Sequence, residues 1–166
     1  MTAVVAALVI SAGIIATIVD IRTRRVPNVL TMSLASAGLL LAMGGLSELT
    51  VGGALAGLVI GLAVMLPGHV LGATGAGDVK LVAAFGTLLG PDGILGAFIR
   101  MAIAGGLIAL MVATSRGRFR ETIQGTTLLV ATRGRAAAMV SDASLNNRFP
   151  YAPAIAIGAS LMVLGW

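Results

Sequence analysis

Two of the six acidic residues, Asp20 and Asp78, stand directly beside long apolar runs, and their type and setting favour chemistry. An ionisable group at the edge of an apolar run is costly, so it indicates function. Two carboxylates brought together in a poorly hydrated site share one proton, because like charges cannot both ionise cheaply. The ionised carboxylate draws a proton from water, and the protonated one stabilises the oxyanion and helps the amine to leave. The pair therefore predicts hydrolysis of a peptide bond without a metal or an organic cofactor.

The alternative interpretation is that each aspartate only pairs with a nearby base. Asp78 would then pair with Lys80, and Asp20 with one of the arginines that follow it, namely Arg22, Arg24 or Arg25. The other acidic residues fall in polar connections, where a solvated surface charge is expected: Glu48, Asp92, Glu121 and Asp142. The two interpretations of the first pair stay open at this point.

Apolar segments must position these residues. The 166-residue chain is 58% hydrophobic and 10% charged, whereas a soluble domain carries about 25% charged residues. Six apolar segments can be marked, at about 3–19, 29–47, 51–69, 76–90, 93–114 and 150–166. A membrane span needs about 20 residues, so most of them qualify or nearly do. The fourth either begins upstream of Leu81 and carries Asp78 and Lys80 near its start, or enters the membrane as an irregular segment that is buried in protein or lines a wet cavity. We expect an all-α, polytopic membrane protein with six transmembrane helices, in one domain over residues 1–166.

Basic residues set the expected orientation. With an outside N-terminus, the cytoplasmic side receives every Lys and Arg except Arg100, while the opposite connections around Glu48 and Asp92 hold none. This agreement with the positive-inside rule predicts that both termini lie outside. A basic cytoplasmic loop is expected at about 115–149, either solvated or, over residues 121–131, resting on the headgroups as a surface helix; the solvated loop is the preferred interpretation.

The composition argues against metal-binding and nucleic-acid-binding functions, and a few single residues have structural interpretations. The chain has no Cys and a single His69, which excludes thiolate and multi-His metal sites. Few aromatics and clustered bases between apolar runs give no support for nucleic-acid binding. We expect His69 to be a satisfied interfacial residue, and Arg100 either to snorkel or to pair within the bundle. Small residues at Gly53, Gly57 and Gly61 predict close helix packing, within one chain or in a homo-oligomer.

Three short stretches surround the two aspartates and the last span. Residues 20–28 read DIRTRRVPN, residues 75–81 read GAGDVKL, and residues 150–158 read PYAPAIAIG. Pro27 should hold Val26 in extended geometry and start the next helix. Glycine immediately before Asp78 allows a substrate strand to come close.

In this order, the three stretches resemble the type IV prepilin peptidases, the bacterial branch of the G-x-G-D membrane aspartyl proteases. The resemblance covers almost the whole chain. It implies that Asp20 and Asp78 match the two catalytic aspartates, and that the substrate is the N-terminal leader of prepilins or pseudopilins, cut at the cytoplasmic face of the plasma (inner) membrane. Residues expected to bind substrate or support the dyad are Gly75, Gly77, Lys80, Arg22, Pro27, Asn28, Pro150 and Tyr151.

One departure from the larger family members concerns an added N-terminal domain with paired Cys motifs, associated with N-methylation. The chain begins directly with a span and has no Cys, so it is similar to the short, peptidase-only forms of tight-adherence pilus systems, and methyltransferase activity is not expected. Two other functions stay open. One is a small proton-coupled transporter, although its site would be expected near the midplane of the membrane. The other is a non-catalytic membrane protein of pilus or secretion assembly.

Overall fold

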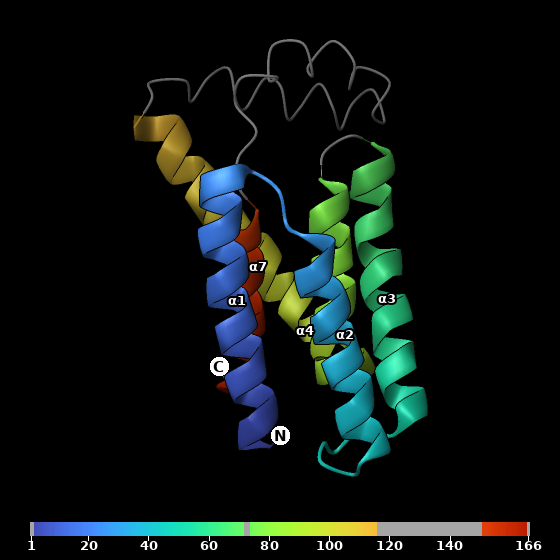
Figure 1. Cartoon of the computed structure of the whole chain (residues 1–166). Coiled ribbons are helices and arrows are strands. Elements are labelled where there is room, and N and C mark those ends of the chain that lie inside the picture. The colour runs from blue at the N-terminus through green and yellow to red at the C-terminus, as the bar shows by residue number, and fades with distance from the viewer. Residues whose placement is uncertain (1, 72–73, 116–150, 166) are drawn as a thin grey trace.

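The computed structural model describes residues 2–71, 74–115 and 151–165, and this part of the chain is helical without any strand (Figure 1). The helices are α1 (Ala3–Thr23), α2 (Asn28–Met43), α3 (Val51–Val70), α4 (Ala76–Ser115) and α7 (Ala152–Val163). The expected all-α class is confirmed for these residues. The basic loop predicted at about 115–149, including the surface-helix alternative at 121–131, lies almost entirely outside them.

Three helical stretches are long and apolar enough to cross a membrane: Ala3–Thr23, Val51–Val70 and Ala76–Val112. α2 and α7 are also apolar but shorter, with 16 and 12 residues. α2 ends before the predicted boundary at 47 because the chain turns at Gly44 and Gly45, and Gly45 has a positive φ of 66°. The protein is therefore a helical membrane protein, while the count of six spans and the outside location of both termini stay predictions.

α4 contains a sharp break at Gly90, which joins the predicted fourth and fifth segments. Gly90 has φ 72° and ψ −177°, a conformation that is essentially reserved for glycine. In Figure 1 the part of α4 before Gly90 descends beside α3, and the part after it rises obliquely behind the other helices. Gly90 therefore separates two helices, as the predicted segments 76–90 and 93–114 had it, but Asp92 lies at the start of the second helix rather than in a polar connection.

Glycines let α4 pack closely against its neighbours. A Cβ atom at Gly57 on α3 would collide with the carbonyl oxygen of Gly86 on α4, and one at Gly61 would lie 2.9 Å from the carbonyl oxygen of Val82. Gly57 and Gly61 therefore serve packing within one chain. Since lipid is as apolar as the side chains, such van der Waals contact is what holds membrane helices together.

One end of the bundle gathers the segments that carry the predicted site. In Figure 1 the end of α1 and the starts of α2, α4 and α7 all lie at the upper end, while the N-terminus and the α2–α3 connection lie at the lower end. The buried side chains of the core, which include Val9, Phe85 and Ile94, lie between them.

Candidate active site

Asp20 lies in the last turns of α1 and faces the bundle interior. Its side chain is only 5% exposed. One carboxylate oxygen, Oδ2, accepts a hydrogen bond of 3.2 Å from the backbone N–H of Ala152. Ala152 is the first residue of α7, so its N–H is one of the donors that a helix start leaves without an intrahelical partner. The carboxylate thus occupies the positive end of α7 and ties α1 to it.

Asp78 lies in the first turn of α4 and is 8% exposed. Its Oδ2 accepts a hydrogen bond of 3.2 Å from the backbone N–H of Gly75, and the carbonyl of Gly75 accepts from the N–H groups of Asp78 and Val79. This is the reach-back contact of a capping box, in which a side chain of the first turn bonds the residue that caps the helix. Asp78 therefore also occupies a helix start.

The two carboxylates lie close enough to act on each other electrostatically, although Asp20 and Asp78 are far apart in the sequence. Tyr151, at the start of α7, is a third member of the group. Burial raises the pKa of Tyr151, and the nearby charge of Asp78 raises it further, even though 39% of the residue is exposed. The site thus holds two carboxyl groups that interact electrostatically and, near them, a phenol that stays protonated. Such a group of side chains can transfer protons.

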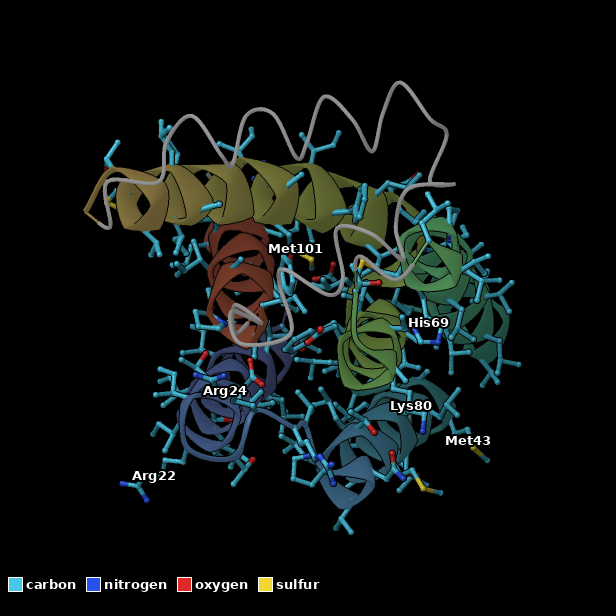
Figure 2. The ribbon with its side chains drawn as sticks, turned by 90° about the horizontal axis from the view of Figure 1, so that it is seen from above. Arg22, Arg24, Met43, His69, Lys80 and Met101 are labelled. Atoms are coloured by element: carbon cyan, nitrogen blue, oxygen red, sulfur yellow. The ribbon has the colours of Figure 1, made fainter. Side chains whose placement is uncertain are left out.

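Neither aspartate pairs with the bases that were considered as partners. The ammonium of Lys80 donates a hydrogen bond of 3.0 Å to Oδ1 of Asn28, and Arg22 is exposed and points away from the bundle (Figure 2). Among the described residues the separate ion pairs of the alternative interpretation are therefore not formed. Lys80 instead links the start of α4 to the start of α2.

The connection between α1 and α2 packs directly against the start of α4. A Cβ atom at Gly77 would lie 3.2 Å from Cβ of Val26, which is buried. The neighbouring Pro27 caps α2, and its carbonyl accepts from the N–H groups of Leu30 and Thr31. The space beside Gly77 is thus filled by the chain itself rather than left for a substrate, whereas Gly75 is exposed.

Three further residues were considered in the sequence, namely Pro150, His69 and Arg100. Pro150 lies outside the described residues. His69 is 3.0 Å from the carbonyl oxygen of Thr74 through its Nδ1, as expected for a satisfied residue. Arg100 donates from Nη1 to the carbonyl of Gly96 at 3.0 Å and to Sδ of Met162 at 3.4 Å, so it is held inside the bundle.

Two contributors were missed by the sequence reasoning, namely the N–H of Ala152 and the side chain of Val26. A backbone donor has no side-chain signature, so only the position of Ala152 in the PYAP stretch could have indicated it. Within the described ranges, no group of three or more His, Cys, Asp or Glu side chains could hold a metal ion.

Comparison with known proteins gave one match. The model of the type IV leader peptidase family matches residues 7–110, a range that includes Asp20, Asp78 and the break at Gly90. Searches of curated proteins and of solved structures found no match.

Proposed function

We propose, from the premise that this chain belongs to the type IV leader peptidase family, that it is a membrane aspartyl endopeptidase acting on prepilins or pseudopilins. It would remove their N-terminal leader, and it would do so with Asp20 and Asp78. The observation that carries this proposal is that two buried carboxylates lie at one end of the bundle, near enough for Asp20 to act electrostatically on Asp78, and that each has one oxygen held by a backbone N–H.

In the proposed reaction the carboxylates share one proton and act as a unit. The ionised carboxylate removes a proton from a water molecule, and the oxygen of that water attacks the carbonyl carbon of the scissile peptide bond. The protonated carboxylate hydrogen-bonds the developing oxyanion and then gives its proton to the leaving amine. The proton taken from water remains on the first carboxylate, so the pair again holds one proton and no cofactor is consumed.

The backbone N–H groups of Gly75 and Ala152 have a positioning role in this mechanism. Each of them occupies one oxygen of one carboxylate, at 3.2 Å, so the orientation of that carboxylate is fixed before substrate arrives. Because the donors belong to the starts of α4 and α7, the geometry of the pair depends on how these two helices pack. Tyr151, which stays protonated, supplies an additional hydrogen-bond donor at the edge of the site.

The site would face the cytoplasm of the plasma membrane. Arg22 and Arg24 stand at the end of α1 and Lys80 at the start of α4, which is the end of the bundle that holds the carboxylates (Figure 1). Glu48 is in the α2–α3 connection at the opposite end. Lys and Arg favour the cytoplasmic side of a membrane protein. This distribution of charge supports a proposed cleavage site on the inner side of the bilayer.

Replacing either aspartate by asparagine tests the proposal. Asp20→Asn and Asp78→Asn keep the size of the side chain but remove the acid–base function, so cleavage of a co-expressed prepilin should fall by about 10²-fold or more. The matched control is Asp92→Asn, which changes an exposed aspartate of α4 away from the site and should cleave at the wild-type rate. Cleavage is followed by the mobility shift of the prepilin, and the amount of inserted protein by immunoblotting of membranes. A normal rate in either dyad variant would show that the assignment is wrong.

A further inference from the structure

A groove runs along the outside of the bundle between α1 and α7, with a volume of about 470 Å³. On α1 it is lined by Ile10, Ile14 and Ile18, which are spaced four residues apart and therefore lie on one face of the helix. From Ile10 to Ile18 this face extends over about 12 Å at 1.5 Å per residue. The groove is thus about two helical turns long.

The α7 side of the groove has the same spacing. Ile157 and Leu161 form an exposed edge, and the smaller Ala156 and Ser160 lie deeper between the two helices. The helices touch behind them, because a Cβ atom at Gly13 would lie 3.0 Å from Cβ of Ala156. Two large edges with small residues between them are the complement of a ridge of side chains on a third helix.

The upper end of this groove leads to the candidate active site. Thr17, which lines the groove, is one turn before Asp20 on α1, and Pro153, which also lines the groove, directly follows the Ala152 whose N–H bonds Asp20. A helix lying in the groove would therefore end within about one helical turn of the level of Asp20, whose side chain faces the bundle interior. The groove and the carboxylate are formed by the same two helices.

We propose that this groove seats the hydrophobic helix of the substrate, the segment that follows the cleavage point, so that the extended leader junction is presented to Asp20 and Asp78. This proposed binding site rests on the proposed function. One face of the substrate helix, over about two turns, would pack between the α1 and α7 edges. Packing of this kind needs no hydrophobic driving force, since close van der Waals contact suffices in lipid.

A second pocket lies between α2, α3 and α4, and it is the natural comparison. It is smaller, at about 290 Å³, and its polar end is formed by Asn28 and Lys80, which bond each other. Its lining therefore includes a charged ammonium, whereas the lining of the α1–α7 groove includes no charged side chain. The α1–α7 groove, which is larger and uncharged, is therefore the better binding site for an apolar helix.

The test compares two substrates and two leucine substitutions in purified, detergent-solubilised protein. One substrate is a complete prepilin with leader and hydrophobic helix, and the other is a soluble peptide with the same cleavage junction but no helix. Ser160→Leu fills the α1–α7 groove, and Ala35→Leu fills the α2–α3–α4 pocket as the matched control. For the complete prepilin we expect Ser160→Leu to raise KM roughly tenfold, as a steric loss of about 1.4 kcal/mol would do. Its kcat/KM for the short peptide, and both parameters of Ala35→Leu, should match the wild type.

A photoreactive residue placed at position 157 supplies a second readout. It should crosslink to the hydrophobic helix of the prepilin, whereas the same residue at Met32 in the other pocket should not. Three outcomes would contradict the groove as binding site while leaving the peptidase function intact. They are an unchanged KM in Ser160→Leu, an equal loss of kcat/KM with both substrates, and crosslinking to lipid alone. A wild-type protein that cuts neither substrate would instead contradict the proposed function, and with it the proposed binding site for the substrate helix.

Discussion

At the scale of single residues, Asp20 and Asp78 have the same surroundings although they stand on different helices. Each is buried, and each gives one oxygen to a backbone N–H at a helix start. A helix start stabilises a negative charge, whereas two negative charges this near repel each other. These opposed effects are the setting in which a pair of carboxylates holds one proton between them.

The hydrogen bond between Lys80 and Asn28 should support the position of Asp78, because it joins the starts of α2 and α4 two residues beyond that carboxylate. Lys80→Met and Asn28→Leu should each lower kcat/KM for prepilin severalfold, since a hydrogen bond to a charged group contributes about 1.5–3 kcal/mol when buried and less when exposed, as here. The double variant should be no worse than the worse single one. Measuring kcat/KM for the three variants and the wild type completes a double-mutant cycle. Losses of kcat/KM that simply add in the double variant would contradict a shared role of the two residues.

Tyr151 should affect stability only in alkaline solution. Its folded-state pKa is raised above the ordinary value of 10.0 by burial and by the charge of Asp78, so above pH 10 the unfolded chain binds fewer protons than the folded one. The free energy of unfolding then falls as the pH rises through this range. Thermal unfolding in detergent should show a smaller alkaline loss for Tyr151→Phe than for the wild type, with identical pH dependence below about pH 9. Equal alkaline losses would contradict the role of this phenol.

At the scale of elements, the contact between α3 and α4 depends on glycines that face each other. Gly57→Ala should destabilise the protein by about 1–3 kcal/mol, because the added methyl group collides with the carbonyl of Gly86 and forces the helices apart. Gly52→Ala is the matched control on the same helix, since its Cβ atom would meet only Thr50 Oγ1 at 3.9 Å. Thermal unfolding of the two variants in detergent measures the difference, and equal stability would contradict the close packing.

The helices themselves could be predicted from hydropathy, whereas their breaks depended on local conformation. The apolar runs predicted α1 and α3 to within a few residues, because a bilayer demands such runs. The segments predicted at 76–90 and 93–114 correspond to the two helices that meet at Gly90, whereas the polar connection expected around Asp92 is not formed, because the second helix begins directly after the break. A positive φ is not visible in the sequence, and a Cβ atom there would also meet Leu49 Cδ2 at 2.7 Å. What decides the position of this break is therefore a backbone conformation and a tertiary contact.

At the scale of the whole molecule, the candidate site combines segments that are distant in the chain. The sequence could predict the two carboxylates, because a buried charge beside an apolar run is conspicuous. It could not predict that the N–H of Ala152 bonds Asp20 across 132 positions, or that Val26 fills the space beside Gly77. Both contacts depend on how α1, α4 and α7 pack against one another. The type of a single residue does not reveal this packing.

The short length of α2 and α7 has a consequence for the surrounding lipid. At 16 and 12 residues these helices extend over about 24 and 18 Å, less than the roughly 30 Å of a hydrocarbon core. Hydrophobic mismatch of this kind is relieved when acyl chains next to the short helices shorten and tilt, so the bilayer thins beside them. α7 begins at Ala152, the hydrogen-bond donor to Asp20, so if α7 crosses the membrane as predicted, thinning beside it would bring bulk water toward that carboxylate without any helix having to move.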